Sequence, residues 1–277
     1  RADEEKLTTL KRRVEDLLSE LPVPVVVLID EVDRIEDSDV RELMHLVRAV
    51  ADFPAISYVL AYDEERVAEA LGFEAPFPRD RINRGRKYLE KIIQVPIQLP
   101  ITFDAELDLL LVEEVKRVLA GIGMSITSPI DKRFAEVRKL LVGSHITTTR
   151  DIRRLAAAFA HRMSLVGGEV EWVDVLGLVA LSMSAPNLFA SIRKTPENFV
   201  FDGDFSVHSS QASFDERFSE LTERRERGAG VQGLFGFLFP AISRQRTHAD
   251  CLMDEVAFRR PLTTYLRMKA LSTAVSR

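Results

Sequence analysis

Two adjacent acidic residues, Asp30 and Glu31, directly follow an unbroken aliphatic run and are placed to support metal-dependent chemistry. The run, Val25 to Ile29, has no polar alternation, which predicts a strand buried on both faces of a parallel sheet. Open sheets of this kind bind ligands at the carboxyl ends of their strands. Two interpretations of the acids are possible. They are either ordinary solvated residues after a buried strand, or a pair in which Asp30 holds Mg²⁺ and Glu31 orients and deprotonates a water molecule; a second strand that ends in an acid favours the pair. Phosphoryl transfer to water requires this equipment.

A second aliphatic run, Ile56 to Tyr62, leads into another acid, Asp63. Because neighbouring parallel strands end at the same edge of a sheet, we expect Asp63 to lie near Asp30 and Glu31. Two interpretations of Asp63 stay open. It is either a polar group that touches a phosphate or the attacking water, or an acid that caps the helix after the strand.

Two arginines are candidate phosphate ligands. Arg34 either forms a local ion pair with Asp33 or points at a phosphate or a neighbouring subunit. Arg150 falls in the first turn of a helix that Thr148 is expected to cap. A cation there opposes the helix dipole, so a bound phosphate would account for its presence.

Strands and helices alternate in the first hundred residues, which predicts an α/β fold with a parallel sheet. A third strand is expected at residues 92–99, at an edge or with a bend, because Pro96 cannot donate a ladder hydrogen bond. Helices are expected at residues 4–21, 38–50, 64–71 and 84–91, with a loop at 72–83.

Beyond Pro100 the spacing of apolar residues becomes helical, so we expect three domains, at residues 1–100, 101–200 and 201–277. Helices are expected at residues 103–119, 132–142, 148–166, 170–183, 214–227 and 262–275. Residues 201–213 read as a polar loop, and residues 231–242 as a buried helix or a partner-facing segment.

Composition excludes several classes of protein. The net charge of −5 gives no sign of a general affinity for nucleic acid or anionic membranes. The single Cys251 cannot form an internal disulfide, and no Cys/His cluster has zinc spacing. No apolar run reaches the roughly 20 residues that span a bilayer. We therefore expect a cytoplasmic protein without a membrane partner.

Four strings resemble the KAP family of P-loop NTPases in their order and spacing: VVVLIDEVDR, ISYVLAYDEERVAEAL, YLEKIIQVPIQLP and TTTRDIRRLAAAF. The later string VEWVDVLGLVALSMSAPNLFASIRK resembles the helical segment that follows in that family. Together they extend from Pro24 to Lys194, or roughly two thirds of the chain. Many members have Asp where this chain has Glu31, but Glu is the commoner base in related ATPases.

The resemblance implies binding and hydrolysis of ATP with Mg²⁺, with Asp30 and Glu31 in the Walker B roles given above. It implies that Arg150, in the T-x-R-D-x-x-R pattern, is similar to a sensor-2 residue on a helical lid. It also implies a nucleotide-site role, of unassigned kind, for Lys91 in Y-L-E-K. Bacterial members of the family are associated with phage defence and plasmid functions.

The chain has no G-x-x-x-x-G-K-[ST] motif, the Walker A loop that cradles phosphates. In related ATPases the strand before that loop lies between the strands that correspond here to residues 92–99 and 56–62. We therefore expect a partial P-loop NTPase core, with an AAA+/ASCE-like three-layer parallel sheet, followed by a mostly helical domain. The Walker A part is expected before Arg1 or on another chain. This chain by itself is expected to bind ATP poorly.

Two alternatives remain open. The chain is either a switch or motor that hydrolyses ATP, or a scaffold that keeps the fold without turnover. A weaker alternative is a helical domain that binds nucleic acid through basic residues between 79 and 86 and between 150 and 162. The expected protein partners are an effector or a second copy of the chain.

Overall fold

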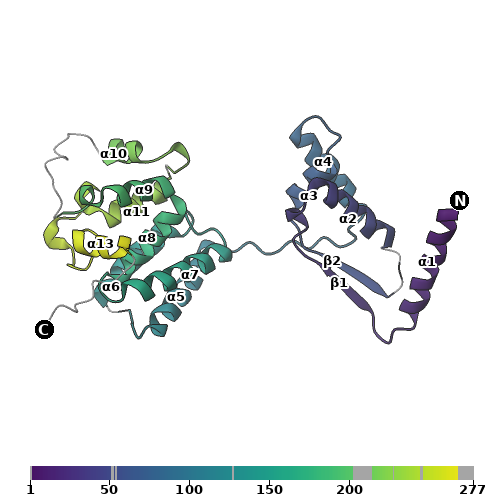
Figure 1. Cartoon of the computed structure of the whole chain (residues 1–277), viewed down its shortest axis with the longest axis horizontal. Coiled ribbons are helices and arrows are strands. Elements are labelled where there is room, and N and C mark those ends of the chain that lie inside the picture. The colour runs from purple at the N-terminus through teal and green to yellow at the C-terminus, as the bar shows by residue number, and fades with distance from the viewer. Residues whose placement is uncertain are drawn as a thin grey trace. The chain divides into compact units, whose positions relative to one another are not determined.

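The chain folds into two compact units, Arg1–Leu99 and Pro100–Arg277. The structure is a computed structural model, and it describes residues 2–267 except 51, 52, 54, 127, 202–213, 227, 244 and 245. Figure 1 shows strands in the first unit, whereas the second is built from helices.

The first unit is organised around two parallel strands, β1 (Val25–Ile29) and β2 (Ile56–Leu60). They pair in register, from Val25 opposite Ile56 to Ile29 opposite Leu60. The helix α2 (Asp37–Val50) provides the crossover that a parallel pair needs. The first two of the three predicted strands are confirmed, although β2 ends at Leu60 rather than at Tyr62.

One face of the sheet carries the core of this unit. The inward residues Ile29 and Leu60 pack against α2, α3 (Glu64–Leu71) and α4 (Pro78–Leu89). A Cβ on Gly85 would lie 1.8 Å from the carbonyl oxygen of Ala68, so only glycine permits this contact between α3 and α4. Helix α4 starts six residues earlier than expected, because Pro78 is favourable in a first helical turn.

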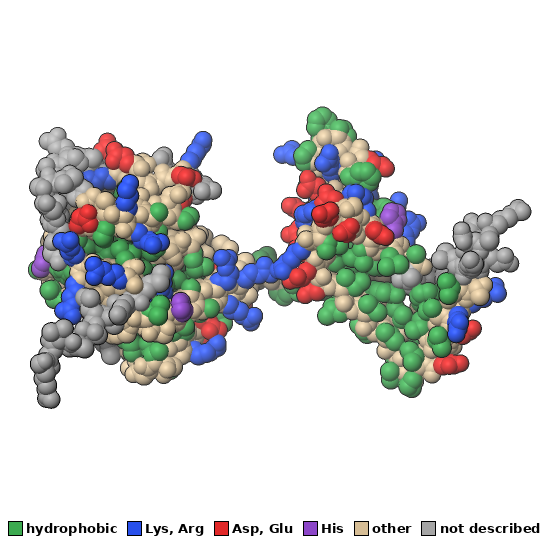
Figure 2. Space-filling view, viewed as in Figure 1, with side chains coloured by type: hydrophobic (Ala, Val, Ile, Leu, Met, Phe, Trp, Pro, Cys, Tyr) green, Lys and Arg blue, Asp and Glu red, His purple; other side chains and the backbone are tan. Residues whose placement is uncertain are grey.

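The other face of the sheet is bare among the described residues. Val26, Leu28 and Val59 are 64%, 69% and 49% exposed. Figure 2 shows hydrophobic side chains gathered over this part of the first unit. The described residues thus form two layers, a sheet and helices on one face, and the expected third layer is not observed.

The third strand predicted at residues 92–99 is wrong. Ile92 is buried at the end of a turn, but Val95, Ile97 and Leu99 are 72%, 82% and 88% exposed in a segment without a ladder. A strand needs a hydrogen-bonding neighbour, and the described sheet has only two strands. Pro96 removes one of the donors that a neighbour would use.

Helix α1 (Ala2–Ser19) forms close to where the sequence predicts a helix. Its apolar residues Leu10, Val14 and Leu17 are 60%, 38% and 58% exposed. The apolar stripe that predicts this helix therefore lacks a covering partner among the described residues.

The second unit packs its helices around one hydrophobic core that draws residues from positions 107 to 265. Its centre is α8 (Trp172–Ser184), in which every residue from Trp172 to Leu181 is buried. The other helices are α5 (Asp104–Gly121), α6 (Ser128–Leu141), α7 (Thr149–Val166), α9 (Pro186–Lys194), α10 (Phe214–Leu221), α11 (Ala229–Leu238), α12 (Pro240–Ser243) and α13 (Arg259–Arg267).

Three expectations for the end of the chain have different outcomes. The segment 231–242 is confirmed as buried helix, in α11 and α12. The loop expected at 201–213 lies almost wholly outside the described residues. The helix expected at 262–275 begins at Arg259 and is described only as far as Arg267.

No single helix among the described residues is long and apolar enough to cross a membrane. The pair α8 and α9 meets the length and composition test together, but the two helices are bent by 119° at their junction.

A buried ionic cluster ties distant parts of the second unit together. Arg133 on α6 lies 2.9 Å from Glu171 and 2.5 Å from Asp174, both at the start of α8. It also lies 3.2 Å from Glu255, which Arg246 approaches at 2.8 Å. The three carboxylates are at most 1% exposed at the side chain. Three acids thus share two guanidinium groups.

This imbalance affects protonation. Burial raises the pKa of Glu171 to about 8, and the Asp174 carboxylate adds to the effect while Arg133 opposes it. Burial also raises the pKa of Asp174 to about 6, against the pull of Arg133. The cluster therefore favours an extra proton in the folded state.

Replacement of Arg133 should strongly destabilise the second unit. Arg133→Met leaves buried carboxylates without their shared guanidinium, which typically costs about 3–5 kcal/mol of unfolding free energy. Urea unfolding followed by helical circular dichroism measures the loss. Arg117→Met is the control, because Arg117 is 70% exposed in its pair with Glu114 and should cost only about 0–1 kcal/mol. Equal losses in the two variants would contradict the role of the cluster.

Stability should fall as the pH rises through the neutral range. The pKa of Glu171 is about 8 in the folded chain against an ordinary value of 4.5, so the folded state holds a proton that the unfolded state releases. The free energy of unfolding should therefore decrease between about pH 5 and pH 8. Glu171→Gln should flatten this dependence, while Glu220→Gln, at an exposed position, should leave it unchanged. An unaltered slope in Glu171→Gln would refute the assignment.

Candidate functional site

The two strands bring the predicted acids to one edge of the sheet. Asp30 and Glu31 follow the last residue of β1, which pairs with the last residue of β2, and Asp63 comes three residues after that. The Ala61 N–H donates to the carbonyl of Ile29 at 2.9 Å, so the backbone pairing continues beyond the strands. The expected convergence of strand ends is therefore present in the backbone.

Glu31 has an unusual backbone conformation. Its φ and ψ are 59° and 32°, in the left-handed region, which costs a residue with a Cβ about 1–2 kcal/mol. Its N–H donates to Oδ1 of Asp30 at 2.8 Å. The short 3₁₀ turn η1 (Val32–Arg34) follows, with Val32 buried beneath it. Strain of this kind is often found at functional sites.

Arg34 does not pair with Asp33, which was one expectation for it. Its Nη1 lies 2.5 Å from Oε1 of Glu31, and both side chains are more than half exposed. Asp33 instead accepts a hydrogen bond from the N–H of Asp63 at 3.4 Å. The turn after β1 is thus tied to the loop after β2, and the expected catalytic base is held by a cation.

Asp63 acts as the N-cap of α3. Its Oδ1 accepts a hydrogen bond from the N–H of Arg66 at 2.9 Å, and the residue has the extended backbone typical of a cap. The capping interpretation is therefore confirmed. Contact with a phosphate or the attacking water stays a prediction.

The acids at the strand ends suit Mg²⁺. Both Asp30 and Glu31 are exposed, and Mg²⁺ in nucleotide sites needs only one or two carboxylates beside phosphates and waters. A site made wholly of protein ligands is absent from the described residues, which contain no group of three or more metal-ligating side chains. The arrangement fits a cation that arrives with a phosphorylated ligand.

Among the described residues, no hydrogen bond or ion pair joins Lys91 or Arg150 to the acids at the strand ends. Lys91 lies in the exposed turn after α4. Arg150 is exposed in the first turn of α7, in the other unit. Thr148 caps that helix as expected, with Asp151 completing a capping box. Nucleotide binding by Lys91 and Arg150 stays a prediction.

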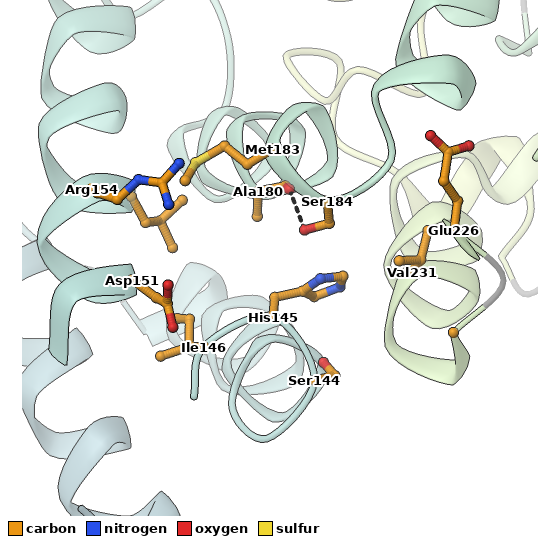
Figure 3. Close-up of a pocket in the computed structure, with 12 residues that line it drawn as sticks. Ser144, His145, Ile146, Asp151, Arg154, Ala180, Met183, Ser184, Glu226 and Val231 are labelled. Atoms are coloured by element: carbon orange, nitrogen blue, oxygen red, sulfur yellow. Dashed lines mark hydrogen bonds between the residues drawn. The ribbon is translucent and has the colours of Figure 1, made fainter. Parts of the chain in front are cut away.

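A pocket of about 350 Å³ lies in the second unit, beside the start of α7, and was not predicted. Figure 3 shows that the residues of its lining come from several segments of the chain. They include Ser144, His145, Asp151, Arg154, Ser184 and Glu226. Adjacent Ser and His residues give no sequence signal for such a pocket, because its walls come from distant parts of the chain.

The polar groups of this pocket mostly serve local structure. Ser144 donates to the carbonyl of Leu140 rather than to the imidazole of His145. Burial lowers the pKa of His145, and a hydrogen bond with the backbone of Gly230 only partly offsets this. Glu226 accepts a hydrogen bond from the N–H of Asn187 at the start of α9. The pocket therefore lacks a nucleophile–base pair, and none of the predicted site residues lines it.

Comparison with known proteins agrees with the geometry of the strand ends. Residues 2–166 match the model of the KAP family P-loop domain, which is more than half of the chain. The chain belongs to the KAP P-loop family. The matched region includes both strands with their acids and continues through α7.

One curated relative of this KAP chain is the phage T7 exclusion protein of Escherichia coli K12. The two are 36% identical over 98 residues, which is 35% of this chain and 13% of the relative. No solved structure matches this KAP chain.

Substitutions at Asp63 should separate its cap from any contact with nucleotide. Asp63→Ala removes the N-cap of α3 and should lower the unfolding free energy of the first unit by about 0.5–2 kcal/mol. Asp63→Asn should keep most of the stability, because Asn caps helices about as well as Asp. Denaturant titration measures both. Full stability in Asp63→Ala would contradict the capping role. Weaker Mg-dependent nucleotide binding by a stable Asp63→Asn would show that the negative charge of Asp63 serves the site, whereas unchanged or tighter binding would leave it as a cap alone.

Proposed function

We propose that this KAP chain supplies the metal-binding and water-activating half of an ATP-hydrolysing site. The supporting observation is the parallel ladder of β1 and β2, which sets Asp30 and Glu31 at the end of one strand and Asp63 just beyond the next. Open α/β sheets bind ligands at this edge. Membership of a P-loop family makes a nucleoside triphosphate with Mg²⁺ the expected ligand.

Each acid has a proposed role. Asp30 would hold Mg²⁺, directly or through water, and the bound ion would supply positive charge opposite the phosphate oxygens. Glu31 orients the attacking water and accepts its proton. Asp63, Lys91 and Arg150 are the proposed contacts to the nucleotide.

The phosphate cradle is proposed to come from a segment outside these 277 residues, in the same polypeptide or in another chain. Three observations support this. The sequence has no Walker A motif, the outer edge of β2 has no described neighbour, and residues 95–99 expose apolar side chains without a ladder. A strand added at the outer edge of β2 would pair with it. A helix behind it would cover the bare face at Val26 and Leu28.

The biological role is proposed to be a nucleotide-driven switch or motor in defence against phage. The name of the relative, a phage T7 exclusion protein, supports this. The match covers 98 residues, and it includes only part of either protein. The switch or motor part of the proposal rests on the site, and the part that concerns phage rests on the name of the relative.

Replacement of the proposed base should stop turnover while nucleotide stays bound. In the protein complete with its phosphate-binding segment, Glu31→Gln should lower the rate of ATP hydrolysis by about 10²–10⁴-fold. It should leave Mg-dependent ATP binding intact, because the amide retains the shape of the side chain. Phosphate release and equilibrium binding of labelled ATP measure the two effects.

Glu36→Gln is the matched control, because Glu36 is an exposed acid in the same segment and should have no effect. Unchanged hydrolysis in Glu31→Gln would sink the assignment of the base. Absence of Mg-dependent hydrolysis in the complete wild-type protein would favour a scaffold that keeps the fold without turnover.

A further inference from the structure

Glu31, the proposed base, forms an ion pair with Arg34, a cation in the same turn. Its Oε1 lies 2.5 Å from Nη1 of Arg34, three residues later in the chain. Among the described residues, Glu31 and Ala55 are the two non-glycine residues with a positive φ. The N–H of Glu31 is bound by Oδ1 of Asp30. Side chain and backbone are thus both restrained.

This ion pair opposes the chemistry that Glu31 would perform. A general base must turn a lone pair towards the water. The guanidinium occupies one lone pair of Oε1 and holds the whole carboxylate in the orientation of the ion pair. The pair does not serve the core, because Glu31 and Arg34 have side chains 53% and 55% exposed. The local anchor of the turn is Val32, which is buried beneath it.

We propose that Arg34 is a positioning residue that restrains Glu31 in the resting state, so that hydrolysis requires this ion pair to open. The inference rests on the proposed function of Glu31 as the base. It assigns Arg34 an action through Glu31, in place of a direct contact with the nucleotide. Because the pair is exposed, its strength is small and sensitive to salt.

The test compares three variants in the complete protein at saturating Mg-ATP. Arg34→Gln removes the cation, and Arg34→Lys keeps it. Arg117→Gln is the control, because Arg117 is an exposed arginine that forms a Glu–Arg pair of the same three-residue spacing on α5, far along the chain from the proposed site. The single-turnover rate of hydrolysis, the KM for ATP and the dependence of both on ionic strength are measured.

Arg34→Gln should raise the single-turnover rate by about two- to fivefold, the range that an exposed ion pair can supply, with little change in KM. Added salt should raise the wild-type rate towards that of Arg34→Gln, whose own rate should depend little on salt. Arg34→Lys should remain close to wild type, and Arg117→Gln should match it.

The restraint would be overturned if the single-turnover rate of Arg34→Gln were lower than that of wild type or unchanged. It would also be overturned if Arg34→Gln raised only the KM for ATP, and that result would assign Arg34 to direct contact with the nucleotide. These outcomes are separate from failure of the proposed function. If Glu31→Gln hydrolyses ATP as fast as wild type, the base assignment fails. If Glu31→Gln is inactive but Arg34→Gln is no faster than wild type, only the restraint fails.

Discussion

The parallel ladder between β1 and β2 is the constraint on which the candidate site depends. Hydrogen bonds fix the register, so the residues that follow the two strands emerge at the same height along the sheet edge. A slip of β1 by one residue would turn Ile29 away from the helices and bring Val26 and Leu28 towards them. The inward packing of Ile29 and Leu60 against α2 and α3 selects the observed register.

The same ladder leaves part of the sheet uncovered among the described residues. A two-stranded parallel sheet with helices on one side leaves an apolar face and open edges, and parallel sheets usually have both faces covered. Such a sheet exposes apolar side chains where no neighbour covers it among the described residues. The exposed residues are Val26, Leu28 and Val59 on the sheet and the unpaired segment at 95–99. The acids at the strand ends are nevertheless held in place within the described residues, because their loops are anchored by the buried Val32 and by the N-cap of α3.

The second unit is organised by a different physical balance. Its core is a large hydrophobic cluster around α8, but Arg133 and three carboxylates lie within it. Burial of these charges is tolerated because they are mutually paired, and the excess acid makes the folded state favour an extra proton. The cluster joins α6 and the start of α8 to the segment that carries Arg246 and Glu255.

The sequence alone determined those features that depend on neighbouring residues. Aliphatic runs predicted β1 and β2, amphipathic spacing predicted most helices, and the acids after each run predicted which edge carries the site. Features that depend on distant partners were decided only by the tertiary structure. Residues 92–99 look like a strand but have no described neighbour to pair with. Asp33 accepts a hydrogen bond from the N–H of Asp63, a residue of the next loop, while Arg34 pairs with Glu31. In the same way, only the fold places Glu171, Asp174 and Glu255 in one buried cluster. Spacing along the chain reveals local periodicity, but long-range ion pairs and strand ladders join groups that are distant in the sequence, so they can be known only from the folded structure.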